Sequence, residues 1–134
     1  MAYKIKLYFA TLLVFLAIDM VWLGIIAHSF YREQIGFLFS PSTNWIAAGL
    51  FYLLFILGIL VFVVLPGLER DSLKWTLRHA ALFGLITYAT YDLTNLATIR
   101  GWPVLLTFVD LIWGTVLTLA VSTISYWIGS RLQS

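Results

Sequence analysis

The stretch WIAAGLFYLLFILGILVFVVL, residues 45–65, determines the fold class of this chain. It contains no charged side chain, and no polar face recurs at the spacing of an α-helix. A helix that is apolar on every side needs an apolar surrounding rather than water, and about 20 residues are enough to cross the hydrocarbon layer of a bilayer. The stretch therefore predicts a transmembrane helix.

Three other segments have similar length and composition. Hydrophobic residues make up 62% of the 134 positions, charged residues only 10%, and the mean hydropathy is +0.97, which lies outside the range of soluble domains. We predict an all-α fold, a single membrane domain over residues 1–134 in which four transmembrane helices form a bundle. The predicted spans lie at about residues 7–27, 45–65, 77–98 and 104–128.

Short motifs between these spans predict how the helices are joined. Pro66-Gly67 is expected to end the second helix, because proline removes a backbone donor and disfavours the helical conformation before it. Gly101-Trp102-Pro103 predicts a tight turn, so the third and fourth helices should be antiparallel neighbours. The longer connection from His28 to Asn44 carries several aromatic residues and predicts a short amphipathic element at the outer interface.

The basic residues predict the orientation of the chain. Cytoplasmic loops of membrane proteins carry an excess of lysine and arginine. If the N-terminus is cytoplasmic, six of the eight basic residues lie on that side, and we therefore predict that both termini are cytoplasmic. The six are Lys4, Lys6, Arg70, Lys74, Arg78 and Arg131, and the two on the outer side are Arg32 and Arg100.

Composition also argues against several kinds of site. The basic residues are scattered and form no patch that would follow a phosphate backbone, so we exclude nucleic acid as a partner. The chain has no cysteine, which removes thiolate chemistry and cysteine-bound metals. His28 and His79 lack a second ligand at the spacing of helical metal sites. We predict neither a metal nor a cofactor, and we expect membrane lipids as partners.

Three aspartates are the strongest candidates for function. Asp19, Asp92 and Asp110 each lie inside a predicted span, where an ionised carboxylate costs about 2.5 to 3.5 kcal/mol on insertion scales. Counting residues along the helices places all three in the outer half of the bilayer. We expect them to approach one another inside the bundle, with Arg100 as a nearby cationic partner.

Helical spacing adds further candidates around the aspartates. Polar residues of the third span recur at i, i+4 and i+7, which places them on one face. The first and fourth spans share an Asp-x-x-Trp pattern followed by glycine, DMVWLG at 19–24 and DLIWG at 110–114, and glycines permit close helix contact. Because these spans run in opposite directions, an inverted repeat is one interpretation. The candidate ligand-binding or proton-binding residues are Asp19, Trp22, Tyr88, Tyr91, Asp92, Asn95, Arg100, Asp110 and Trp113.

These segments also resemble a known family. The run YATYDLTNLAT at 88–98, the turn RGWP at 100–103, DLIWG at 110–114, DMVWLG at 19–24 and FYR at 30–32 are similar to those of the DUF2177 family of bacterial membrane proteins. The resemblance covers essentially the whole chain. It implies four helices in the bacterial inner membrane and emphasises Asp19, Asp92, Asn95 and Asp110, but it implies no reaction and no catalytic residue.

Three classes of function fit these features. A small carrier could bind a proton and a lipophilic cation in exchange at the carboxylates, and a chain of this size would need a homodimer to enclose a path. A membrane enzyme acting on a lipid or isoprenoid could use paired carboxylates as acid and base. An accessory subunit could use the aspartates as interhelical hydrogen-bond acceptors. The sequence favours the carrier only slightly.

Overall fold

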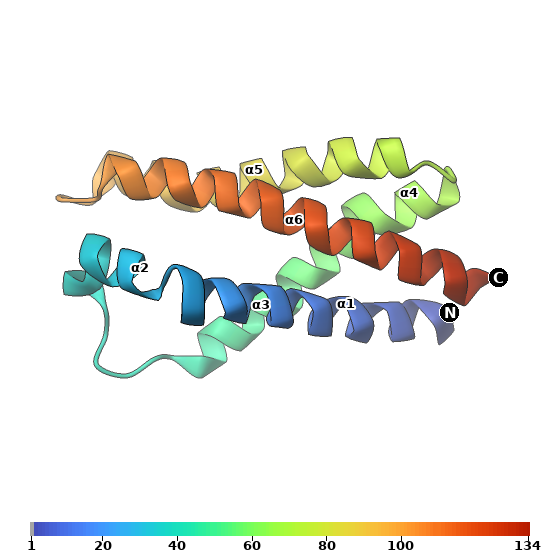
Figure 1. Ribbon diagram of the computed structural model, residues 1–134, viewed down its shortest axis with the longest axis horizontal. Coiled ribbons are helices and arrows are strands. Elements are labelled where there is room, and N and C mark those ends of the chain that lie inside the picture. Colours follow the sequence, from blue (N-terminus) through green and yellow to red (C-terminus); the bar gives the residue numbers. More distant parts are fainter. Residues whose placement is uncertain (1) are drawn as a thin grey trace.

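The computed structural model describes residues 2–134, and Figure 1 shows these residues as an elongated bundle of helices. No strand occurs among them, which confirms the predicted all-α fold. In chain order the elements are α1 (Ala2–Val21), the π-helix η1 (Trp22–Ile26), α2 (His28–Ile35), the 3-10 turn η2 (Gly36–Leu38), α3 (Trp45–Ile59), the π-helix η3 (Leu60–Val64), α4 (Leu65–Glu69), α5 (Leu73–Thr98) and α6 (Val104–Gln133).

Three continuous helical rods are long and apolar enough to cross a membrane. They are Ala2–Ile26, Trp45–Glu69 and Val104–Gln133 within the described residues. Helix α5 has comparable length, 26 residues, but carries more polar side chains and does not reach the same composition. The count of four spans therefore stays a prediction.

The second rod contradicts the predicted helix end at Pro66-Gly67. The helix runs through both residues and ends at Glu69. The reason lies in η3, whose wide turns bond the Leu65 amide to the Leu60 carbonyl five residues back. Pro66 then stands in the first turn of α4, where the amide it lacks would have had no regular partner.

Local signals do account for the starts of α3 and α5. The Asn44 side chain accepts a hydrogen bond from the Ala47 amide at 3.1 Å, and the Ser72 side chain accepts one from Trp75 at 3.0 Å. Both are N-cap arrangements that satisfy donors left unpaired at a helix start. Gly101 reverses the chain between α5 and α6 with a φ of 81°, a backbone conformation that favours glycine.

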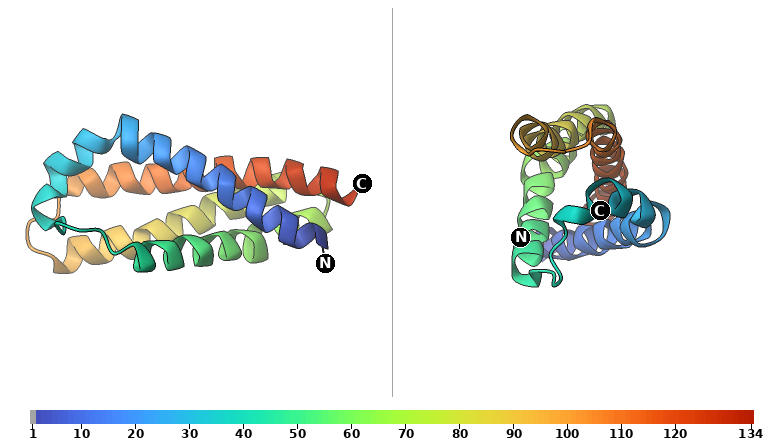
Figure 2. Two further views of the ribbon diagram at one scale, coloured as in Figure 1. Left: turned by 90° about the horizontal axis from the view of Figure 1, so that it is seen from below. Right: turned by 90° about the vertical axis from the view of Figure 1, so that its left-hand side faces the viewer.

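Helices α5 and α6 form the tightest pair in the molecule, as the short turn between them predicted. They run antiparallel side by side, visible in yellow and orange-red in Figures 1 and 2. A Cβ atom at Gly84 would collide with the Gly114 carbonyl, and one at Gly114 would collide with the Tyr88 ring. The glycines thus allow the close approach that sets Tyr88 against α6.

The rod formed by α3, η3 and α4 crosses the bundle obliquely. Its first part, α3, packs against α1, whereas η3 and α4 pack against α5. Figure 1 shows the same path, from the level of α1 near residue 45 to the level of α5 near residue 69. The hydrophobic core fills the space where the helices converge, around Phe15, Phe55, Ile59, Leu117 and Val121. Beyond this core, toward α2, helices α3 and α5 separate.

Candidate functional site

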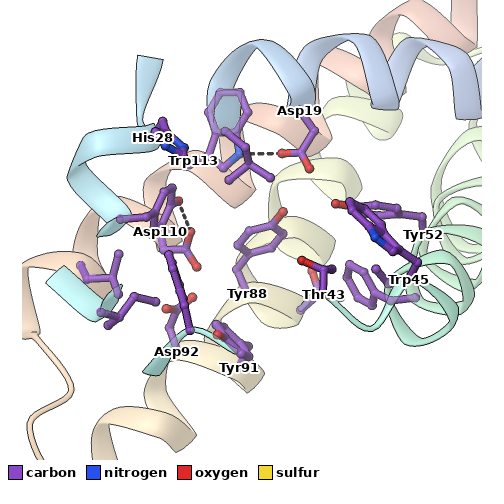
Figure 3. A pocket seen from close by; sticks show the side chains of 18 residues that line it. Asp19, His28, Thr43, Trp45, Tyr52, Tyr88, Tyr91, Asp92, Asp110 and Trp113 are labelled. Atoms are coloured by element: carbon purple, nitrogen blue, oxygen red, sulfur yellow. Dashed lines mark hydrogen bonds between the residues drawn. The ribbon is translucent and has the colours of Figure 1, made fainter. Parts of the chain in front are cut away.

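A cavity of about 880 Å³ occupies the end of the bundle where α3 and α5 separate. This volume is within the range of small-molecule sites. Figure 3 shows its walls, to which α1, α2, α3, α5, α6 and the loop before α3 contribute. The lining residues are Asp19, Leu23, His28, Tyr31, Ile35, Phe39, Thr43, Trp45, Ala48, Phe51, Tyr52, Thr87, Tyr88, Tyr91, Asp92, Leu106, Asp110 and Trp113.

The three aspartates line this one cavity from three different helices. Asp19 belongs to α1, Asp92 to α5 and Asp110 to α6, and all three are buried. Among residues 2–134, no lysine, arginine or histidine nitrogen lies within 4.0 Å of their oxygens. Buried carboxylates are ordinarily paired with a cation or fully hydrogen-bonded, so the contacts of each one matter.

Asp110 is held by side chains of η1 and α2, the two elements that follow α1. The Tyr31 hydroxyl of α2 donates a hydrogen bond to Asp110 Oδ1 at 2.6 Å and accepts one from Trp22 Nε1 at 3.0 Å. Burial, and then the nearby Asp110 carboxylate, raise the pKa of Tyr31 above its ordinary value. The hydroxyl therefore stays protonated and remains the donor to Asp110.

Asp19 is held more loosely, and by the opposite helix. Trp113 Nε1 of α6 donates to Asp19 Oδ1 at 3.4 Å, the long end of the hydrogen-bond range. The indole of Trp113 stacks on that of Trp22, with 4.2 Å between ring centroids and 10° between planes. Tyr52 of α3 lies on the other side of Asp19 (Figure 3).

The two Asp-x-x-Trp segments are therefore connected crosswise. The tryptophan of the α6 segment donates directly to the aspartate of the α1 segment. The tryptophan of the α1 segment reaches the aspartate of the α6 segment through Tyr31. This reciprocal arrangement is what an antiparallel repeat would produce, with Tyr31 inserted on one side only.

Asp92 differs from the other two aspartates because it has no hydrogen-bond partner. Its side chain is completely buried, and neither carboxylate oxygen meets a donor among the described residues. The carboxyl group of Asp110 is its neighbour across the α5–α6 contact (Figure 3). Asp110 has the Tyr31 donor on one side, but no donor lies between the two carboxyl groups, and a hydrogen-bond donor or a cation placed there would satisfy Asp92.

Six of the nine predicted site residues line the cavity and three do not. Trp22 lies behind the cavity wall and acts on it through Tyr31 and Trp113. Asn95 is half-buried outside the cavity, and Arg100 is exposed with no ion pair to the aspartates. The expected cationic partner is therefore absent from the described cluster, because a shared depth along the helix axis does not place Arg100 on the inward side. The six are Asp19, Tyr88, Tyr91, Asp92, Asp110 and Trp113.

The glycine of the α1 segment also departs from expectation. Gly24 was expected to permit close helix contact, but a Cβ atom there would meet nothing within 4 Å. The glycine lies in η1, where the α1 rod widens and then bends at Ala27 into α2. Close contact is a property of Gly114 alone within this pair of segments.

Sequence reasoning missed several aromatic residues of the cavity wall. Tyr31 belongs to the connection that we expected at the outer interface, and neither Trp45 nor Tyr52 is among the predicted site residues, yet all three line the cavity. The segment around Tyr52 is apolar on every side, so no periodic pattern marks its inward face. The inclusion of Tyr31 in the FYR motif was the one available signal.

Within the described residues, no group of three or more His, Cys, Asp or Glu side chains is placed to hold a metal ion.

In comparisons with known proteins, residues 4–127 match the family described as "Predicted membrane protein (DUF2177)". No curated protein matches the chain, and no solved structure does.

Proposed function

The chain belongs to the DUF2177 family of predicted membrane proteins, and we propose that it binds a small organic cation in the cavity, in exchange for protons. One observation carries this proposal. Three carboxylates line a cavity with aromatic walls, His28 is the one basic residue among the lining residues, and no basic nitrogen of residues 2–134 lies within 4.0 Å of the carboxylate oxygens. Carboxylates together with aromatic faces attract organic cations.

The contacts of the aspartates assign them different parts in binding. Asp92 and Asp110 are neighbours, and Asp92 has unsatisfied oxygens, so the cationic centre would lie between them. The aromatic rings of Tyr88, Tyr91 and Trp113 would face its apolar groups. Protons compete with such a cation because protonation removes the negative charge that attracts it.

We place the protein in the bacterial inner membrane with four spans, α5 being the fourth, and both termini in the cytoplasm. Helix α5 packs along the full-length apolar helix α6, which supports a shared transmembrane position. The excess of basic residues at the ends of the rods near the termini supports the orientation. In this placement the cavity lies in the outer half of the bilayer.

As a carrier the protein would act as a homodimer, since one copy encloses a cavity at one end of the bundle and a packed core at the other. The buried hydrophobic core lies between the cavity and the termini. A second copy would have to supply the remaining wall of any path through the membrane.

The test is the binding of tetraphenylphosphonium to the protein in lipid nanodiscs, measured by equilibrium dialysis against empty nanodiscs. We expect saturable binding that weakens as the pH falls. Asp92→Asn and Asp110→Asn should each weaken it at least tenfold. Asp71→Asn is the matched control, because Asp71 is an exposed residue in the turn between α4 and α5.

Two results would overturn the proposal. If Asp92→Asn and Asp110→Asn bind the cation as wild type does, the carboxylates are not its site. If wild-type protein binds no cation while both variants lose thermal stability, the aspartates serve only to hold the helices together.

A further inference from the structure

We propose that the natural ligand of this cavity is a long-chain primary amine whose head is bound at Asp92 and whose chain leaves the protein sideways, between α3 and α5, into the bilayer. This inference rests on the proposed cation binding and specifies the ligand. It follows from three features of the described residues: the opening between two helices, the residues at its rim and the unsatisfied carboxylate inside.

The opening is a consequence of the oblique path of α3. The first turns of α3 pack on α1, and contact with α5 begins near the end of α3 and continues through η3 and α4. Phe55 closes the space where the rods converge, packing on Phe83 and Tyr88 with centroid distances of 5.6 and 6.3 Å. On the other side of Phe55 the cavity has walls on both α3 and α5.

The rim of this opening is apolar and exposed. Trp45 and Phe51 on α3 are 75% and 50% exposed, and Tyr91 on α5 is 53% exposed, although all three line the cavity. Phe51 and Tyr91 lie within predicted spans, with Trp45 at the start of its span. The cavity therefore meets hydrocarbon and the interface at this rim, and an occupant must be compatible with both.

The inside of the cavity selects the head of the ligand. Both oxygens of Asp92 lack a donor, and Asp110 is its neighbour. A primary ammonium group carries a positive charge and three N–H donors, so it can serve both carboxylates at once. A quaternary ammonium carries the charge without donors, and a zwitterionic phospholipid would bring its phosphate toward three carboxylates.

The chain-length dependence of binding is the primary test. The dissociation constant of wild-type protein in nanodiscs is measured for octylamine, decylamine, dodecylamine and tetradecylamine. It is expressed in terms of the free amine in water, and equilibrium dialysis of empty nanodiscs gives the amine taken up by lipid alone. If the chain lies in the bilayer, the dissociation constant falls about fourfold with every added methylene, since each is worth about 0.8 kcal/mol of transfer, without levelling off. A closed cavity would give a plateau once the chain fills it, and that plateau would overturn the inference.

Two comparisons test the head and the position of the opening. Dodecylamine should bind at least tenfold tighter than dodecyltrimethylammonium, and equal affinity would contradict the role of the unsatisfied oxygens. Ala48→Trp should weaken dodecylamine binding at least tenfold, because Ala48 lies on the cavity wall between Trp45 and Phe51. Ala47→Trp is its control, being exposed and outside the wall. Equal effects of the two variants would move the opening elsewhere.

The result with tetraphenylphosphonium separates this inference from the proposed function. If that compact cation binds through Asp92 and Asp110 while the amine series reaches a plateau, the cavity binds cations but does not open between α3 and α5. If neither the compact cation nor any amine binds, both proposals fail together.

Discussion

The two Asp-x-x-Trp segments have the same spacing and opposite surroundings. In the α6 segment, Gly114 is buried under the Tyr88 ring and Asp110 accepts a hydrogen bond of 2.6 Å. In the α1 segment, Gly24 faces open space and Asp19 accepts one of 3.4 Å. The first is built into the α5–α6 contact, whereas the second runs from α1 into the π-helix η1, just before the bend at Ala27. The shared motif therefore places an aspartate at the cavity in both segments, and the residues packed around each segment determine how tightly that aspartate is hydrogen-bonded.

The difference assigns distinct properties to the two halves of the site. The α6 segment, α5 and Tyr31 form a firm wall that positions Asp92 and Asp110. The α1 segment forms the other wall, where Asp19 accepts its hydrogen bond from the indole of Trp113 on α6. Changes on the α6 side should therefore affect folding more than the equivalent changes on the α1 side.

The largest contrast is expected between the two glycines. Gly114→Ala inserts a methyl group into the Tyr88 ring and should lower the free energy of unfolding by about 1 to 3 kcal/mol, the usual effect of overpacking. Gly24→Ala meets no atom and should leave stability unchanged or slightly raised. Titration with sodium dodecyl sulfate in mixed micelles measures both. Equal losses would show that the α1 segment is packed as tightly as the α6 segment.

The second contrast concerns the two tyrosines beside the aspartates. Tyr31→Phe removes the donor to Asp110 and the acceptor of Trp22 and should destabilise the protein by about 1 to 2 kcal/mol. Tyr52→Phe removes a hydroxyl that lies near Asp19 but lacks the short contact that Tyr31 makes to Asp110, and it should cost about 0.5 kcal/mol or less. The same titration measures both variants. A larger loss for Tyr52→Phe would reverse the assignment of the firm and loose walls.

The third prediction concerns the contact that joins the segments. Trp22 and Trp113 stack in parallel at 4.2 Å, and aromatic pairs contribute about 0.5 to 1.5 kcal/mol beyond their burial. A double-mutant cycle with Trp22→Leu and Trp113→Leu should give a coupling energy in that range. Phe51 and Phe62 lie on the same rod without stacking on each other, and their cycle is the control. A coupling near zero for the tryptophans would make the two segments independent.

Much of this architecture could be predicted from the sequence, because the bilayer imposes lengths and composition. The apolar segments and the common level of the three aspartates along the bundle follow from counting residues along helices, and the turn follows from Gly101. The three carboxylates could be expected together because an isolated one is costly in hydrocarbon. Their role in binding stays a prediction.

The sequence could not predict which side of each helix faces the interior, or the path that each helical rod takes through the bundle. The α3 rod is apolar all round, so nothing marked Tyr52 or Phe51 as facing a cavity. Arg100 was expected beside the aspartates, but it is exposed and does not line the cavity. Pro66 lies inside a helix because η3 alters the hydrogen bonding before it, and no residue pattern announces a π-helix. These features depend on which neighbour each helix meets.

The smallest expected effect is that of Asp19→Asn on folding. The amide oxygen can still accept the hydrogen bond from Trp113, and at 3.4 Å that bond contributes little. We expect a change of about 0.5 kcal/mol or less in the free energy of unfolding. Asp110→Asn is the matched comparison. Its oxygen can likewise accept from Tyr31, but its new amide donor faces the unpartnered Asp92, so this variant should be at least as stable as wild type while losing cation binding. If Asp19→Asn instead proves more destabilising than Tyr31→Phe, then Asp19 holds the bundle together in its ionised form, and the α1 segment is the firm half of the site.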